Sequence, residues 1–199
     1  MIIIKLGGSL INSAKGLVKE IIDHSDKCRD EILIVPGGSV FADTVRKIDA
    51  SQEAAHWMAV LAMEQYAYYL ADGTGAKLID SLKIDCIGTY ILLPYNLLKE
   101  KDELPHTWDV TSDTIAAWVA KQLDARFIKV TDVDGVYING VLEKEIYAGE
   151  LIGKETCVDR ELPHFLIRNR MNCEIINGNC PGRLVNALAG NVSGTLIKG

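Results

Sequence analysis

The segment MIIIKLGGSL, Met1–Leu10, opens the chain and decides the fold that we expect. Its three consecutive isoleucines, Ile2–Ile4, form a β-branched run that is typical of a buried strand. Lys5 and Leu6 then lead directly into Gly7, Gly8 and Ser9. A glycine pair after a buried strand lets the backbone turn sharply and approach a ligand, and its N–H groups can bind an oxyanion beside Lys5. The segment therefore predicts a phosphate site, with an ordinary glycine turn as the alternative.

The same pattern occurs a second time. A second apolar run, Ile32–Val35, is followed by Pro36, Gly37, Gly38 and Ser39. Helices are expected after the two glycine pairs, over 10–25 and 40–47. Alternation of short apolar strands with helices predicts a mostly parallel sheet that helices cover on both faces, an α/β sandwich. In such sheets ligands bind at the carboxyl ends of the strands, so both glycine pairs should lie at one edge.

The next long helix is expected over Ser51–Leu70, and it is apolar almost all round, which predicts burial. His56 lies on one of its faces and is either a packed core residue or a contact for a substrate. Strands are expected over 77–79 and 86–93. The charged segment Pro94–Pro105 is interpreted as a connector, so we place a boundary there, between an N-terminal lobe at 1–103 and a C-terminal lobe at 104–199.

The second half begins with a helix inside Leu104–Ala125, for which Asp109, Thr111 and Ser112 are candidate caps. Asp109 and Asp113 either cap this helix or present carboxylates to the ligand edge. A strand at 127–131 then leads into Asp132–Tyr137, which is either an Asp-Gly turn in a hairpin or a ligand loop. Later elements are expected at 162–170, 173–176, 184–188 and 194–197.

The composition of the chain argues against several classes of function and of binding site. The chain has 199 residues, is 48% hydrophobic and carries a net charge of −6, which argues against nucleic-acid binding because that requires a basic face. Five widely spaced cysteines without a C-x-x-C pair predict neither a zinc ribbon nor a redox motif, and no metal ligand is assigned. We find no signal peptide and no apolar run long enough to cross a membrane, so a cytoplasmic protein is expected.

Several nucleotide and hydrolase signatures are absent from the sequence: the Walker-type G-x-x-x-x-G-K-[ST], G-x-G-x-x-G, H-E-x-x-H and G-x-S-x-G. Walker-type ATPases, dinucleotide enzymes and serine hydrolases are therefore disfavoured.

Five short motifs together resemble the amino-acid kinase family. They are KLGGS at 5–9, PGGS at 36–39, TSD at 111–113, TDVDGVY at 131–137 and GTLI at 194–197. They occur in the family's order and cover nearly the whole chain. The resemblance implies an αβα sandwich around a mostly parallel sheet, with the phosphoryl acceptor bound by the N-terminal part and ATP by the C-terminal part.

The resemblance also implies roles for individual residues. Lys5 would stabilise charge on the transferring phosphoryl group, and Asp113 would orient that lysine. Backbone donors around the transferring group and the acceptor would come from Gly7, Gly8, Gly37 and Gly38. The nucleotide side would further include Ser9, Thr131, Asp132, Gly135 and Tyr137. The acceptor side would include His56 and Asp109. Many members carry a second lysine before a late helix, but residues 156–160 read TCVDR, so Lys15 is the candidate for that second cation.

One branch of the family is more similar still, over 56–72, 104–120 and 176–183. That branch acts in archaeal methanofuran biosynthesis, where ATP converts [5-(aminomethyl)furan-3-yl]methyl phosphate to the diphosphate. The resemblance implies ATP and Mg²⁺ as cofactors, a small phosphate acceptor and a homo-oligomer. Isopentenyl phosphate, a carboxylate acceptor such as an amino acid, and a non-catalytic nucleotide- or oxyanion-binding protein remain the alternatives.

Overall fold

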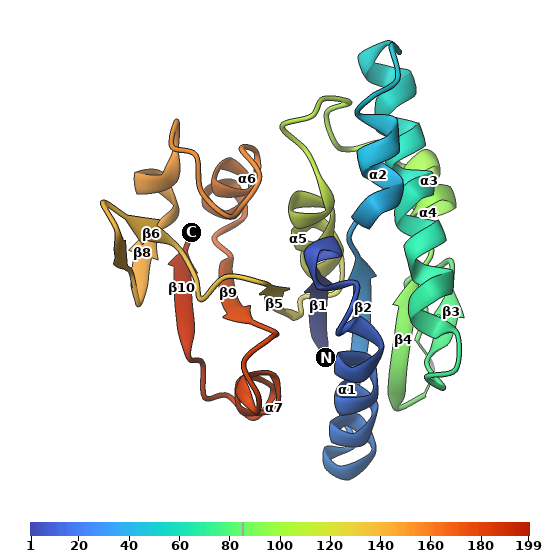
Figure 1. Ribbon diagram of the computed structural model, residues 1–199, viewed down its shortest axis with the longest axis vertical. Helices are drawn as coiled ribbons and strands as arrows, with labels where there is room; N and C mark the ends of the chain where they lie inside the picture. The colour runs from blue at the N-terminus through green and yellow to red at the C-terminus, as the bar shows by residue number, and fades with distance from the viewer. Residues whose placement is uncertain (85) are drawn as a thin grey trace.

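The computed structural model describes residues 1–84 and 86–199 and is built on an eight-stranded sheet (Figure 1). Its strand order is β3-β4-β2-β1-β5-β9-β10-β8, and β6 and β7 form a separate hairpin. The strands are β1 (Ile2–Leu6), β2 (Glu31–Pro36), β3 (Lys77–Ile79), β4 (Gly88–Leu92), β5 (Arg126–Thr131), β6 (Tyr137–Ile138), β7 (Val141–Leu142), β8 (Glu145–Tyr147), β9 (Asn172–Asn177) and β10 (Gly194–Lys198).

The opening strand β1 lies inside this sheet, as a buried apolar run should. It pairs in parallel with β2 on one side and with β5 on the other, and Lys5 lies opposite Val35 and Lys129. The pairings in the sheet are parallel, apart from the antiparallel pair of β9 and β10. The predicted mostly parallel sheet is therefore confirmed.

Helices cover both faces of the sheet (Figure 1). Ile4 faces a core that includes Leu17 of α1 and Leu184 of α7, whereas Ile3 faces a core that includes Trp118 of α5 and Leu166 of α6. This alternation along β1 is the two-residue period of a strand with both faces buried. The helices are α1 (Ala14–Cys28), α2 (Ser39–Val45), α3 (Gln52–Ala71), α4 (Pro94–Lys101), α5 (Ser112–Gln122), α6 (Leu162–Asn169) and α7 (Arg183–Leu188).

Two expectations about helices were wrong. The first glycine loop continues into a short 3-10 helix over Gly8–Leu10, so α1 begins at Ala14 and not at Leu10. The segment read as a connector contains α4, which begins with Pro94 in its first turn and buries Leu97 and Leu98. Proline suits that position because the first helical N–H has no partner within the helix.

The proposed lobe boundary at residue 103 lies between α4 and α5. Because β1 and β5 pair directly, one sheet continues through both proposed lobes. Across residues 1–84 and 86–199, no helix combines the length and apolar character needed to cross a bilayer.

Candidate active site

The two glycine loops meet at the carboxyl ends of β1 and β2. A Cβ on Gly8 would lie 2.4 Å from the Ser39 backbone nitrogen, and one on Gly37 would lie 2.7 Å from the Gly8 nitrogen. The Ser39 hydroxyl donates a hydrogen bond to the Gly8 carbonyl at 3.1 Å. The glycines are therefore required because the two loops touch backbone to backbone, a reason that the sequence pattern of either loop alone does not reveal.

Lys5 shares the face of β1 with Ile3 and points toward the first turn of α5. Its Nζ lies 2.9 Å from Oδ1 of Asp113, and both side chains are buried. The other carboxylate oxygen of Asp113 lies 2.5 Å from Nζ of Lys129, which also donates a hydrogen bond to the Cys157 carbonyl. Asp113 is thus shared by two lysines that lie opposite each other on neighbouring strands.

Burial and charge act in opposite directions on these three groups. Burial alone would raise the pKa of Asp113, but Lys129 and Lys5 hold this pKa well below its usual range. Burial lowers the pKa of Lys5, and Lys129 lowers it further, although Asp113 opposes both effects. The pKa of Lys129 is raised despite its burial, because Asp113 stabilises the charged form. Because Lys5 and Lys129 share one carboxylate, the Lys5 ammonium is available to interact with an anionic ligand in the cavity.

The start of α5 is held by a residue that lies far along the chain. Asp159 accepts hydrogen bonds from the backbone nitrogens of Thr111 at 2.9 Å and Thr114 at 3.0 Å, and from the Thr114 hydroxyl at 2.6 Å. Thr111, one of the three candidate caps, is the N-cap residue, but its side chain makes no capping bond, and the capping acceptor is the distant Asp159 carboxylate. Burial raises the pKa of Asp159, and the neighbouring charge of Asp113 raises it further.

A cavity of about 510 Å³ opens beside this cluster. Of the predicted site residues, it is lined by Lys5, Gly8, Ser9, Gly38 and His56. Ser39 of the PGGS motif also lines it, together with side chains that the sequence analysis did not single out, namely Asp43, Arg46, Gln52 and Trp108. Their position directly after the second glycine loop is the signal that could have indicated Asp43 and Arg46.

His56 is a neutral member of the cavity wall. Its ring stacks on His106 with 4.5 Å between ring centroids and meets Trp57 edge-on. Burial, together with the neighbouring His106, lowers the pKa of His56 to about 4. At neutral pH this imidazole can therefore exchange hydrogen bonds with a ligand but carries no charge for it.

Of the residues predicted for the nucleotide, Thr131 and Asp132 lie at the carboxyl end of the neighbouring strand β5. Thr131 ends β5, and its hydroxyl donates to the Asp132 carboxylate at 3.2 Å. Gly7 is held against this strand because its nitrogen donates to the Val130 carbonyl at 2.8 Å. Gly135 has a φ of +154°, and a Cβ there would lie 2.3 Å from the Thr195 hydroxyl oxygen, so this turn admits only glycine. Tyr137 is exposed in β6.

Lys15 and Asp109 are not brought into the Lys5 cluster. Lys15 lies outside the cavity, with its Nζ 2.7 Å from the Asp72 carboxylate. Asp109 is exposed and lies 3.8 Å from Arg160. The buried cation that pairs with Asp113 beside Lys5 is Lys129, which the sequence reading missed. Its signal was a lysine inside the apolar strand FIKV, on the same strand face as Phe127.

Comparison with known proteins agrees with this arrangement. The family described as "Amino acid kinase family" matches residues 1–153. A curated protein of Methanocaldococcus jannaschii, [5-(aminomethyl)furan-3-yl]methyl phosphate kinase, is 35% identical over 203 aligned residues, which cover 96% of this chain and 94% of that protein.

Solved structures support the fold. Uridylate kinase from Archaeoglobus fulgidus superposes with a TM-score of 0.74 at 19% identity, covering 98% of this chain and 99% of its own. UMP kinase from Ureaplasma parvum gives a TM-score of 0.74 at 17% identity, covering 100% of this chain and 98% of its own. Because the family matches residues 1–153 of the 199 in the sequence, the chain belongs to the amino acid kinase family.

Proposed function

We propose that this kinase transfers the γ-phosphoryl group of ATP to a small phosphate monoester, and that the acceptor is [5-(aminomethyl)furan-3-yl]methyl phosphate. The observation that carries the proposal is the 35% identity to the kinase of that acceptor along almost the full length of both chains. The cavity beside Lys5 supplies the physical support, because it joins an anion-binding edge to a pocket of mixed polarity.

In this proposal the acceptor occupies the cavity, next to Gly37, Gly38 and His56, and ATP lies beyond the Gly7–Gly8 turn. Thr131, Asp132, Gly135 and Tyr137 then belong to the nucleotide side, together with Ser9. An acceptor phosphate oxygen forms a bond to the γ-phosphorus while the bond from that phosphorus to the ADP oxygen breaks. Lys5 stabilises the negative charge on the transferring group, and Asp113 fixes the position of Lys5.

A Mg²⁺ ion accompanying ATP fits the donors on this side. Magnesium prefers oxygen ligands and takes most of them from phosphates and water, so one or two carboxylates suffice. Asp132 is an exposed carboxylate whose pKa would be raised by burial but is lowered by the neighbouring Ser9, its own backbone and Thr131. We therefore assign Asp132 as the carboxylate that would hold the ion, which would neutralise phosphate charge.

The charges of the cavity favour an acceptor with both a phosphate and an amine. Lys5 and Arg46 are cationic, and Asp43 is the acidic side chain among the residues that line the cavity. Asp43 lies 2.6 Å from Arg46, and the Arg46 guanidinium lies over the Trp108 ring at 5.2 Å. An acceptor with an aromatic ring and an ammonium group could contact Trp108 and Asp43 in place of the Arg46 side chain. Isopentenyl phosphate has a phosphate but neither an aromatic ring nor an amine.

A parallel assay of several acceptors tests the proposal. The purified protein with ATP and Mg²⁺ is given the aminomethylfuran phosphate, the same compound without its amine, isopentenyl phosphate and free amino acids. We expect the highest kcat/KM for the aminomethylfuran phosphate, with ADP and diphosphate formed in equal amounts. Preferred turnover of isopentenyl phosphate or of an amino acid would refute the assigned acceptor.

The same assay tests whether the protein only binds nucleotide, because a protein without catalytic activity releases no ADP in step with product.

The homo-oligomer expected from the resemblance is a separate prediction, which a measurement of molar mass by light scattering tests. The functions of the two lobes, acceptor at 1–103 and nucleotide at 104–199, are tested by mapping each ligand with chemical-shift changes.

A further inference from the structure

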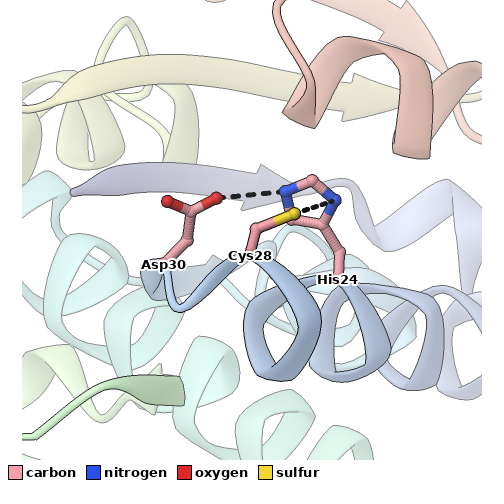
Figure 2. A group of neighbouring side chains, drawn as sticks. All are labelled: His24, Cys28 and Asp30. Atoms are coloured by element: carbon pink, nitrogen blue, oxygen red, sulfur yellow. Dashed lines mark hydrogen bonds and ion pairs between the residues drawn. The ribbon is translucent and has the colours of Figure 1, made fainter.

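A cluster of three potential metal ligands lies at the end of α1. His24 and Cys28 are four residues apart in the last turns of this helix, and Asp30 follows the left-handed residue Arg29 that ends it. Figure 2 shows the three side chains facing one another. His24 Nε2 lies 3.1 Å from Asp30 Oδ2, Cys28 Sγ lies 4.0 Å from His24 Nδ1, and one ligand atom from each residue falls within 4.8 Å of the others.

This cluster is separate from the proposed active site. The glycine loops lie at the carboxyl ends of β1 and β2, whereas α1 ends where β2 begins, at the opposite edge of the sheet. The residues that line the cavity include none of the three. Any role of the cluster is therefore independent of phosphoryl transfer.

The donor set selects a class of metal. An imidazole nitrogen, a thiolate sulfur and a carboxylate oxygen are ligands for Zn²⁺ and related transition ions, whereas Mg²⁺ and Ca²⁺ prefer oxygen alone. The thiolate and carboxylate charges would offset the charge of a divalent ion. The carboxyl end of a helix also favours a cation, because the helix dipole is negative there.

Two of the three groups are already held in place. The His24 side chain is only 7% exposed, and Asp30 fixes its ring. The backbone of Asp30 is fixed in turn, because the Ser25 hydroxyl donates to the Asp30 carbonyl at 2.7 Å and the Asp30 nitrogen donates to the Ser25 carbonyl. Only the exposed Cys28 side chain would need to turn toward the ion, so little ordering entropy opposes binding.

We propose that His24, Cys28 and Asp30 form a binding site for a zinc-class divalent transition metal ion, with solvent completing the coordination. The Cys28 thiol loses its proton to solvent when it binds. The ion would join the end of α1 to the start of β2 and so stabilise the connection between helix and sheet. Asp30 either binds the ion directly or holds the His24 ring as its hydrogen-bond acceptor, and its removal weakens the site in both arrangements.

Cobalt titration of the reduced, metal-free, full-length protein tests the site. A Co²⁺ ion bound to a thiolate gives a charge-transfer absorption band in the near ultraviolet. We expect this band to saturate at one Co²⁺ per chain and to disappear when Zn²⁺ is added. Cys28→Ser should abolish the band, and Asp30→Asn should weaken Co²⁺ binding by roughly tenfold or more.

The matched control is Cys86→Ser, because Cys86 is the other exposed cysteine among the described residues. This variant should keep the band, and Zn²⁺ should raise the melting temperature of both the wild type and Cys86→Ser but not that of Cys28→Ser. Absence of the band in the wild type, or a band that persists in Cys28→Ser, would overturn the proposal. Neither readout depends on kinase activity, so the proposed function can fail while this site stands.

Discussion

At the scale of single residues, the site depends on how Asp113 divides its carboxylate between Lys5 and Lys129. Replacing Lys5 with alanine leaves Asp113 paired with Lys129, so the protein should still fold. The replacement removes the cation that faces the cavity, and we expect kcat to fall by about 10² or more, the size of effect seen when a single charge-stabilising donor is lost. Steady-state kinetics with a melting curve as the folding control measures this. Near wild-type turnover would show that Lys5 has no catalytic role.

Replacing Asp113 with asparagine should reduce both activity and stability. The substitution removes the carboxylate that the two buried ammonium groups share, and breaking a buried ion pair in this way costs about 3–5 kcal/mol. Asp109→Asn is the control, because Asp109 is exposed and its 3.8 Å contact with Arg160 is also exposed, so little change is expected. Equal, small effects of the two substitutions on kcat would move the orienting role away from Asp113.

The pH dependence of folding gives a second readout of Asp113. Its folded-state pKa is depressed, so its contribution to stability is fully present above the unfolded-state pKa, about 3.9 for an aspartate, and is lost as the pH falls below that value. Wild-type protein should therefore lose more free energy of unfolding than Asp113→Asn when the pH falls from 5 toward 3. Urea melts across this range measure the difference, and parallel curves would contradict it.

Lys129 is expected to act as a positioning residue through Asp113 and Lys5. Its charge lowers the pKa of Lys5, so Lys129→Met should raise that pKa and move the alkaline limb of the kcat profile to higher pH. The same variant should lower kcat more than it raises the acceptor KM, because Lys129 lies outside the residues that line the cavity. A loss of stability alone, with an unshifted pH profile, would mean that Lys129 only fills the core.

At the scale of elements, the first glycine loop must pack against the second. Gly8→Ala places a methyl group 2.4 Å from the Ser39 backbone, which forces the loops apart and should lower kcat/KM by tenfold or more, since misplacement by about 1 Å can cost 10²-fold. Gly16→Ala is the control, because Gly16 lies in α1 with open space around its Cα. That change should instead stabilise the protein by about 0.5–1 kcal/mol. Normal activity of Gly8→Ala would show that the loops adapt.

Strands and helices could be predicted where they depend only on the pattern of neighbouring residues. The apolar runs of β1, β2 and β5 and the long apolar helix α3 follow from residue order alone, and the glycine pairs indicated the ligand edge. The acceptor that caps α5 could not be predicted, because Asp159 lies 48 residues beyond Thr111 and contacts it only in the folded chain. Lys129 was missed for a related reason: a lysine in an apolar strand has meaning only when the neighbouring strand places another lysine and a carboxylate beside it.

At the scale of the whole molecule, the cavity is enclosed by both proposed lobes. Its wall takes Lys5, Arg46 and His56 from the first 103 residues and Trp108 and Ile115 from the remainder. The sheet is continuous through the same two parts, because β1 pairs with β5. A ligand in the cavity should therefore stabilise the chain as one unit.

Thermal unfolding tests this coupling. We expect a single calorimetric transition without ligand, because the lobes share one sheet and cores on both of its faces. Acceptor phosphate at 100 times its Kd should add about 2.7 kcal/mol of stability and raise the melting temperature by several degrees, still in one transition. The amine alone, without its phosphate, binds without the Lys5 contact and should shift the transition less. Two transitions, of which the acceptor moves only one, would show that the lobes unfold separately and that the acceptor contacts a single lobe.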